Sequence, residues 1–355
     1  MNKLRWGILS TAAIGRKNWR AIRDSGTNVV TAVASRDLER SRKFIADSQQ
    51  AAPVETAPAA LGSYEELIAS PEVDAIYVPL PTGLRKEWIL RAAAAGKHVL
   101  CEKPCGVSLS DVREMTDACH ANGVQFMDGV MFMHNPRMGR MRELLDDGKT
   151  IGPIRRIMTS FSFQAVEVFY DANIRVNAEL EPMGCLGDLG WYCVRFALWA
   201  MNWQLPREAT GKILTARGNR LSPGTAPTDF SGELIFADGS SMGFYCSFRA
   251  QHQNWAHVGG ATGWLRVDDF VHPTSVHEPS FTVNGKEERV KVCDCVGPHT
   301  DSRVPAHDAQ MFRNFAQQVA SGKLNADWPM WSLKTQQVLD GCFESAKQGG
   351  RTVSL

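Results

Sequence analysis

The chain has 355 residues, of which 44% are hydrophobic and 22% charged, and its 39 basic and 38 acidic residues give a net charge of +1. A chain of this length predicts two domains with separate cores. The balanced charge, with neither a basic run nor an acidic tail, argues against nucleic acid or a membrane surface as a partner. No apolar stretch approaches the roughly 20 residues of a membrane span.

The N-terminus and the cysteines predict a protein of the reducing cytoplasm. The sequence enters an apolar strand at once, without the cationic and apolar regions of a secretory signal. Among the nine cysteines, the closest pairs, Cys101/Cys105 and Cys293/Cys295, lack Cys-x-x-Cys spacing. We therefore expect free thiols, no metal site and a cytoplasmic location.

The first predicted strand, Arg5–Ser10, is followed by a turn of small residues and a helix over residues 16–24. Strand, turn and helix in this order form the context in which a Gly-x-Gly-x-x-Gly fingerprint binds a dinucleotide. Here the three glycine positions are Ser10, Ala12 and Gly15. Small side chains still allow backbone N–H groups to approach a pyrophosphate. The turn therefore predicts cofactor contacts from Ser10, Thr11, Ala12, Ala13 and Ile14.

The second predicted strand, Asn28–Ala34, ends in Ser35, Arg36 and Asp37. An acid at this strand tip is typical of NAD-binding proteins, whereas an arginine accommodates the 2′-phosphate of NADP. Asp37 is placed to cap the helix predicted over residues 38–47. Ser35 and Arg36 thus favour NADP over NAD, although NAD stays open.

Two more buried strands precede the stretches with the strongest functional signal. Residues 49–62 read as a loop and 64–69 as a short helix, and the strand Val73–Val78 then ends in Pro79, Leu80 and Pro81. A helix over 85–95 and the strand His98–Cys101 lead to Glu102, Lys103 and Pro104. The alternation predicts a doubly wound parallel sheet. Ligands of such sheets collect at the carboxyl ends of the strands, which places both proline-containing segments beside the cofactor.

A helix over 108–122 and a strand over 124–127 complete the first domain, for which we predict residues 1–127. The crossover Asp128–Arg137 opens the second domain, predicted as 128–355. Asn135 is expected to cap, and Pro136 to begin, a helix that runs to Leu145.

The pattern changes after Ile154 to short alternating strands. The side chains of residues 154–164 alternate in the manner of a strand. Two hairpins are indicated, one by Ala237-Asp-Gly239 and one by Asn284-Gly285. The second hairpin is predicted to join strands over 280–283 and 289–292. Helices over 306–321 and 330–347 follow, and Val353 is expected at a sheet edge. The second domain is thus predicted as α+β, with a large, open, mainly antiparallel sheet.

The segment Gly184–Arg195 carries a second motif, in which Asp188 and Tyr192 are four residues apart and share one helix face. Asp188 suits the N-cap of a helix through Ala200. Both side chains would then lie near the positive end of the helix dipole, which helps a phenol to lose its proton. A capping Asp and a packed Tyr are the structural alternative.

Taken together, Pro79-x-Pro-Thr, Ala95-Gly-Lys-His-Val-Leu-Cys-Glu-Lys-Pro104 and the second motif resemble the glucose-fructose oxidoreductase / inositol dehydrogenase (Gfo/Idh/MocA) family of NAD(P)-dependent oxidoreductases. The resemblance implies that Lys103 is catalytic or orients substrate, and that Pro104 is cis beside the nicotinamide. It further implies that Met131 and His134 line the nicotinamide and substrate pocket, and that the outer face of the open sheet makes a homodimer or homotetramer.

The family's second motif usually ends in histidine, whereas this chain has Tyr192. That departure resembles the dihydrodiol and aldose dehydrogenase side of the family, in which the tyrosine is the proposed acid/base. The resemblance therefore implies hydride transfer between a nicotinamide and a hydroxyl or carbonyl of a sugar, polyol or diol. Lys103 and Tyr192 would be the acid–base pair and Asp188 their orienting partner.

Two readings compete with a dehydrogenase that releases its cofactor. The weakened turn at Ser10 and Ala12 allows a non-catalytic NAD(P)-binding sensor or scaffold of the same fold. A cofactor that is retained and recycled is the other reading. The substrate itself is not specified, although Gln164, Glu167, Tyr170 and Arg175 could bind a polyol.

Overall fold

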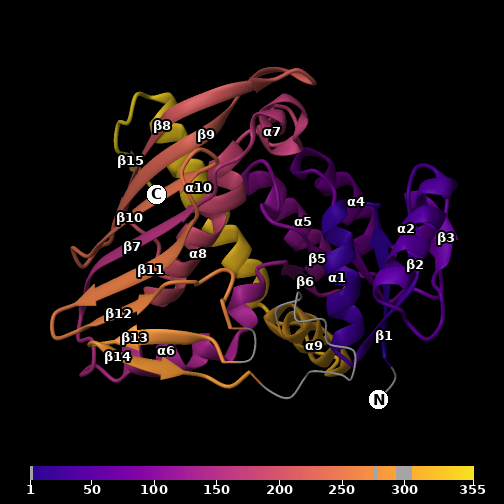
Figure 1. The fold of residues 1–355 in the computed structure, drawn as a ribbon, viewed down its shortest axis with the longest axis horizontal. Coiled ribbons are helices and arrows are strands. Elements are labelled where there is room, and N and C mark those ends of the chain that lie inside the picture. Colours follow the sequence, from indigo (N-terminus) through magenta and orange to yellow (C-terminus); the bar gives the residue numbers. More distant parts are fainter. Residues whose placement is uncertain (1–2, 276–277, 293–305) are drawn as a thin grey trace.

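The computed structural model describes residues 3–275, 278–292 and 306–355, which form two sheets with helices packed against them (Figure 1). The six-stranded sheet has the order β3-β2-β1-β4-β5-β6 and all its pairs are parallel. Its strands are β1 Leu4–Leu9, β2 Asn28–Ala34, β3 Ala59–Leu61, β4 Ala75–Val78, β5 His98–Cys101 and β6 Phe126–Asp128. The helices between them are α1 Ala13–Asp24, α2 Leu38–Ala51, α3 Tyr64–Ala69, α4 Thr82–Ala94 and α5 Leu109–Ala121. The predicted doubly wound Rossmann sheet is confirmed.

Short polar side chains start three of these helices. The side chain of Asp37 accepts a hydrogen bond from the Glu39 N–H, as predicted for an N-cap. Ser63 and Ser108 cap α3 and α5 in the same way. Each cap satisfies an N–H that has no partner within its own helix, so the local sequence fixes where these helices begin.

The prediction of a loop over residues 49–62 is wrong at both ends. Helix α2 continues to Ala51, and the short strand β3 pairs with β2 at the edge of the sheet. Three residues are too few to show an alternating pattern. Likewise α1 begins at Ala13 rather than Arg16 and α4 at Thr82 rather than Arg85.

The second sheet has nine strands in the order β14-β13-β12-β11-β7-β10-β9-β8-β15, and is antiparallel except between β7 and β10. Its strands are β7 Ile154–Ser162, β8 Glu208–Asn219, β9 Ser222–Ile235, β10 Ser241–Ser247, β11 Gln253–Gly260, β12 Trp264–Val267, β13 Ser280–Val283, β14 Lys286–Arg289 and β15 Val353–Ser354. The predicted α+β domain is confirmed, although β8 and β11 were absent from the prediction.

The Asn284-Gly285 hairpin is present, but its second strand begins at Lys286 instead of Arg289. Asn284 and Gly285 both have positive φ, 48° and 82°. Two residues of this kind form a tight turn whose flanking residues pair at once. Val283 therefore faces Lys286, and the strand cannot start three residues later.

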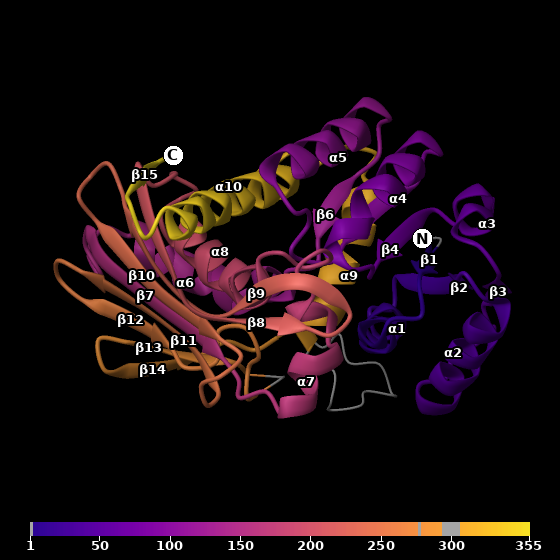
Figure 2. The same cartoon turned by 90° about the horizontal axis from the view of Figure 1, so that it is seen from above.

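The chain up to the end of β6 is called the first part below, and the residues after β6 the second part. Helices of the second part cover one face of the nine-stranded sheet and then return to the six-stranded sheet. They are η1 Met131–His134, α6 Pro136–Asp146, α7 Glu167–Ala172, η2 Ile174–Val176, the π-helical turn η3 Leu186–Gly190, α8 Trp191–Ala200, α9 Ala306–Ala320 and α10 Asp327–Lys347. Figure 2 shows α10 running from the nine-stranded sheet toward α5, with α9 near α1. As predicted, Asn135 caps α6 and Pro136 is its first residue.

A buried ion pair joins the two parts. Arg195 on α8 is fully buried, and its guanidinium binds the carboxylate of Asp128 at the end of β6 with both terminal nitrogens. From α10, the Ser332 hydroxyl donates to the Asp128 carboxylate, and the Thr335 hydroxyl accepts from the Arg195 Nε. Helices α9 and α10 follow residue 128 in the chain but pack against α1, α5 and β6 of the first part. The domain boundary between residues 127 and 128 therefore stays a prediction.

The remaining expectations from composition concern cysteines, metals and membranes. Seven cysteines are buried and free, while Cys293 and Cys295 lie outside the described residues. Within the described ranges, no three metal-ligating side chains gather into a group. None of the helices described is long and apolar enough to span a bilayer.

Candidate active site

A cavity of about 770 Å³ lies at the carboxyl ends of β1, β4 and β5 and is bounded on its other side by the second part of the chain. The first part contributes the start of α1, the Pro79-Leu80 segment and Glu102 to Pro104. The second part contributes residues from η1, β7, the π-helical turn and α8. The cavity thus joins the two predicted motifs.

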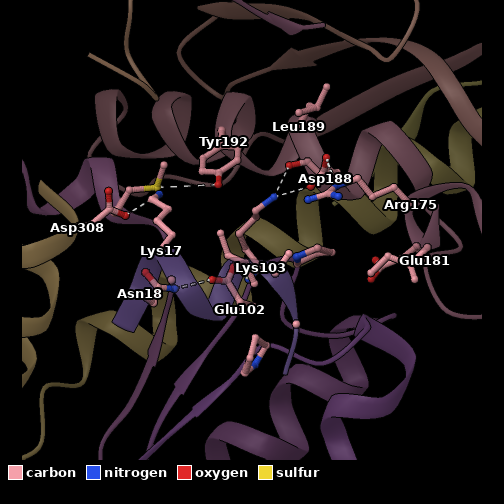
Figure 3. A pocket seen from close by; sticks show the side chains of 18 of the residues that line it. Lys17, Asn18, Glu102, Lys103, Arg175, Glu181, Asp188, Leu189, Tyr192 and Asp308 are labelled. Atoms are coloured by element: carbon pink, nitrogen blue, oxygen red, sulfur yellow. Dashed lines mark hydrogen bonds and ion pairs between the residues drawn. The ribbon is translucent and has the colours of Figure 1, made fainter. Parts of the chain in front are cut away.

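Lys103 and Asp188 meet across this cavity (Figure 3). The Lys103 ammonium donates to the Asp188 carboxylate at 2.6 Å and to the Asp188 carbonyl at 2.9 Å. The Arg175 Nε donates to the other carboxylate oxygen at 2.8 Å. Since the Lys103 and Asp188 side chains are only 10% and 12% exposed, water screens this pair little.

Asp188 is the anion that orients two cations. Burial alone would raise its pKa, but the charges and hydrogen bonds of Arg175 and Lys103 outweigh burial and hold the pKa well below its usual value. The predicted N-cap role is wrong, because Asp188 lies inside the π-helical turn η3, which continues into α8 without a break. Its oxygens bind side chains instead of helix N–H groups.

Tyr192 stands next to the same ammonium. Lys103 Nζ lies 4.7 Å from the centre of the Tyr192 ring, and the phenol points at the Met131 sulfur at 4.0 Å. A thioether is a weak acceptor, so the hydroxyl proton remains available to a substrate oxygen. The phenol of Tyr192 and the amine of Lys103 therefore lie in one cavity.

The expected lowering of the Tyr192 pKa is wrong. Burial raises the pKa well above its usual value, and the nearby carboxylates Glu102, Asp188 and Asp308 raise it further. The helix dipole cannot compensate, because α8 continues from η3 and leaves no free N-terminus beside Tyr192. The structure therefore holds the phenol protonated.

Close packing brings the two motifs together. The Lys103–Pro104 peptide is cis, as the resemblance implied. A Cβ added to Gly187 would lie 3.3 Å from the Pro104 ring. A glycine at position 187 thus lets the π-helical turn that carries Asp188 approach the loop that carries Lys103.

The other end of the cavity fits a dinucleotide. Ala12, Ala13 and Ile14 line it at the start of α1, whose first turn has no side-chain cap, so its N–H groups suit a phosphate. Ser10 has a φ of 135°, which glycine adopts readily and other residues at a cost of about 1–3 kcal/mol. A Cβ on Gly15 would lie 3.2 Å from Phe44. These two positions keep the glycine roles of the fingerprint.

Most predicted site residues lie on this cavity. Lining it are Ala12, Ala13, Ile14, Pro79, Leu80, Glu102, Lys103, Met131, Asp188 and Tyr192. Thr11 and Pro81 are neighbours of lining residues, and Ser35 and Arg36 follow the carboxyl end of β2, where Ser35 is buried and Arg36 exposed.

Two predicted substrate residues lie elsewhere. The His134 imidazole is buried, contacts Asn314 at 3.1 Å and lines a separate cavity beside Trp328. The Gln164 amide accepts a hydrogen bond from Gln251. His134 ends the 3-10 turn η1, which turns its side chain toward α9, whereas Met131 at the start of that turn faces the main cavity.

Sequence reasoning missed several polar groups that line the cavity. They are Lys17, Asn18, Arg85, Glu181, His252, His272 and Asp308. Lys17 pairs with Asp308 at 2.8 Å, and burial together with Lys17 lowers the pKa of His272 to about 3, so its imidazole is neutral. Lys17, Asn18, Arg85 and Glu181 each stand within three residues of a motif, but none is part of one.

Asp188→Asn should destabilise the protein by about 3 kcal/mol at pH 7, because it leaves the buried Lys103 and the half-buried Arg175 without their anion. Folding lowers the Asp188 pKa, so its contribution is complete above the unfolded value of 3.8 and declines as the pH falls below that value. The difference between wild type and variant should therefore be about 1 kcal/mol smaller at pH 3. Urea unfolding at both pH values measures it.

Asp268→Asn is the matched control, because the Asp268–Arg266 pair is exposed and contributes about 0–1 kcal/mol. Equal stability of Asp188→Asn and wild type at pH 7 would contradict the assignment of Asp188 as the stabilising anion.

Comparison with known proteins places this site in a family. Residues 4–130 match the model of an oxidoreductase family with an NAD-binding Rossmann fold, and residues 138–266 match the GFO/IDH/MocA C-terminal domain. The chain is 33% identical to trans-1,2-dihydrobenzene-1,2-diol dehydrogenase of Mus musculus over 80% of this chain and 79% of that protein. It is 29% identical to D-xylose 1-dehydrogenase (NADP(+)) 2 of Haloferax volcanii over 97% and 98%.

Among solved structures, a 3-ketoreductase from Actinomadura kijaniata in complex with NADP and TDP-benzene superposes with a TM-score of 0.79. It is 26% identical, over 97% of this chain and 98% of that one. The chain therefore belongs to the Gfo/Idh/MocA family of NAD(P)-dependent oxidoreductases.

Proposed function

We propose that this protein is an NADP-preferring oxidoreductase that transfers hydride between the nicotinamide and a carbon bearing a hydroxyl or carbonyl in a sugar, polyol or diol. One observation supports this most strongly: the Lys103 amine and the Tyr192 phenol converge in a cavity that also reaches the N-terminus of α1. The named relatives, a dihydrodiol dehydrogenase, a xylose dehydrogenase and a 3-ketoreductase, support the same substrate class.

Lys103 and Tyr192 are the proposed acid–base pair. The dinucleotide supplies or accepts the hydride when bound. In reduction, the protonated Tyr192 hydroxyl gives its proton to the substrate oxygen while the Lys103 ammonium stabilises the negative charge that develops there. In oxidation, Tyr192 first releases its proton to solvent, and the phenolate, stabilised by the Lys103 cation, then accepts the proton of the substrate hydroxyl as hydride leaves the carbon.

Asp188 orients this pair without donating a proton. Its carboxylate stays ionised, because Arg175 and Lys103 lower its pKa, and it fixes the ammonium through two contacts, at its carboxylate and at its carbonyl. The neutral imidazole of His272 lies on the same cavity, where it can donate to or accept from a second hydroxyl.

Lys103→Met and Tyr192→Phe should each lower kcat by about 100-fold to 10,000-fold, the range for loss of a general acid–base group. The Kd for NADP should change little, because neither change touches the start of α1. Hydride transfer is followed at 340 nm with a panel of aldoses, polyols and cyclic diols, and NADP binding by titration of the intrinsic fluorescence. Turnover retained by both variants would contradict the assignment.

The same panel separates the enzyme from a sensor of the same fold. NADP binding by the wild type without hydride transfer to or from any panel member would favour the sensor. NADP that remains bound through purification and is reduced and oxidised in place by two different sugars would favour the retained cofactor.

Arg36 is the proposed contact of the 2′-phosphate. Asp37, the acid beside it, already binds the Glu39 N–H as the cap of α2. Arg36→Ala should therefore raise the KM for NADP by about ten-fold, which corresponds to loss of one charge-assisted contact, and leave the KM for NAD unchanged. Arg40→Ala, which removes an exposed arginine from the first turn of α2, is the control. Equal effects on both cofactors would argue against this role.

The open face of the nine-stranded sheet is proposed to make a homodimer. Helices α6, α8 and α10 lie on one side (Figures 1 and 2), and on the other side Met158 is 42% exposed between Gly243 and His257. Light scattering should give twice the monomer mass of 39.2 kDa or a multiple, and Met158→Glu should shift it toward the monomer. A monomeric wild type at micromolar concentration would refute this.

A further inference from the structure

Helix α4 carries a buried arginine, Arg85, that forms no ion pair with any acid among the described residues. Arg85 is 5% exposed and lies on the cavity wall. Its guanidinium donates to three backbone carbonyls: Leu80 at 2.7 Å, Glu102 at 2.7 Å, and Pro104. Two of these carbonyls flank Lys103, and the third belongs to the strand-end segment after β4. Arg85 therefore holds the Glu102–Pro104 loop, which carries Lys103, to the segment that follows β4.

A carboxylate from the second part of the chain fixes the same helix. The side chain of Glu181 is buried and accepts from the Thr82 N–H at 2.9 Å and from the Thr82 hydroxyl at 2.7 Å. The Leu180 carbonyl accepts from the Gly83 N–H. The N-cap Pro81 has no side-chain acceptor, so Glu181 takes the place of a cap, at the favourable end of the helix dipole.

These contacts tie α4 to the segment that carries Lys103 and to the segment that precedes Asp188. Arg85 holds the loop with Lys103, while Glu181 precedes Asp188 by seven residues. Thr82 connects the two sets, because its hydroxyl also approaches the Pro104 carbonyl at 3.4 Å. A shift of about 1 Å between reacting groups can cost about 100-fold in rate.

We propose that Arg85 is a positioning residue of the hydride-transfer site: it holds Lys103 against Asp188 and Tyr192, and Glu181 fixes the helix from which it acts. The proposal rests on the function proposed above. Arg85 contacts neither Asp188 nor Tyr192 in the structure, and it acts through the carbonyls of Glu102 and Pro104.

Arg85→Ala should lower kcat by about 10-fold to 100-fold, while the Kd for NADP changes less than about three-fold. Because Arg85 lines the cavity, the space that alanine leaves is open to small cations. Guanidinium chloride at non-denaturing millimolar concentration should therefore restore kcat at least five-fold, and equal concentrations of sodium chloride and urea should not. Arg85→Lys, which keeps the charge but has fewer donors, should fall between wild type and Arg85→Ala.

Arg142 provides the control. It lies on α6 and also donates to two carbonyls of another helix, those of Trp199 and Ala200, outside the cavity. Arg142→Ala should leave kcat within two-fold of wild type and unresponsive to guanidinium. Glu181→Ala should lower kcat in the same direction as Arg85→Ala, and the double variant should lose no more than about three-fold beyond the poorer single one, since both act through α4.

A kcat for Arg85→Ala and Arg85→Lys within three-fold of wild type would overturn the proposal, and so would a loss that guanidinium leaves unrestored. If Arg85→Ala does not fold, the kcat of Arg85→Lys decides alone, against the same three-fold limit.

A crystal structure of Arg85→Lys separates this proposal from the proposed function. If the wild type transfers no hydride to any substrate, the proposed function fails by itself. The crystal structure of the variant still tests the placement of Lys103. A distance of more than about 3.5 Å between the Lys103 ammonium and the Asp188 carboxylate supports the positioning role. The contact retained near the present 2.6 Å overturns it.

Discussion

The site depends on one ion pair between residues that are 85 positions apart in the chain, Lys103 and Asp188. A lysine at a strand end has a long, flexible side chain that has no fixed place by itself, and ordering it costs about 2 kcal/mol of rotamer entropy. The buried carboxylate offsets that cost and holds the ammonium beside the Tyr192 ring. The pair therefore turns a mobile surface group into a fixed charge facing a cavity.

Both partners depend on tight backbone contacts. The loop of Lys103 is held by Arg85, and the turn of Asp188 packs on Pro104 because Gly187 has no side chain. The π-helical turn has a further consequence: an extra residue per turn shifts the register of the following helix. Asp188 and Tyr192 thereby stay on the cavity side, although neither lies at a true helix start.

Local signals made much of this predictable. Buried runs such as His98–Cys101 mark strands, and Asp37, Asn135 and the Asn284-Gly285 turn mark boundaries through chemistry confined to a few neighbouring residues. The strand-end rule for parallel sheets put Lys103 at the edge where ligands bind, and the resemblance to a family was needed to favour a site over an exposed Glu-Lys pair. The resemblance to a family added Tyr192 as its counterpart.

Three of the errors have a common cause, because each concerns a side chain or helix end whose partner lies far away in sequence. Asp188 looked like a helix cap, but it binds Lys103 and Arg175. His134 belongs to the crossover, but it faces α9. Helix α4 starts three residues early because Glu181, 99 positions later, supplies its cap. No pattern within one segment can show an acceptor that another segment delivers.

The pairing of charges in the cavity shows where chemistry can occur. Asp188 and Asp308 each bind a cation, Glu181 binds Thr82, and Glu102 accepts from the buried Tyr77 hydroxyl at 2.5 Å. Each carboxylate is therefore committed to holding the fold. The Tyr192 hydroxyl, which faces only a weak thioether acceptor, differs from them because a better acceptor can displace that contact at little cost. A substrate oxygen beside Lys103 would be such an acceptor, and this supports the proposal that the phenol is the group that exchanges a proton.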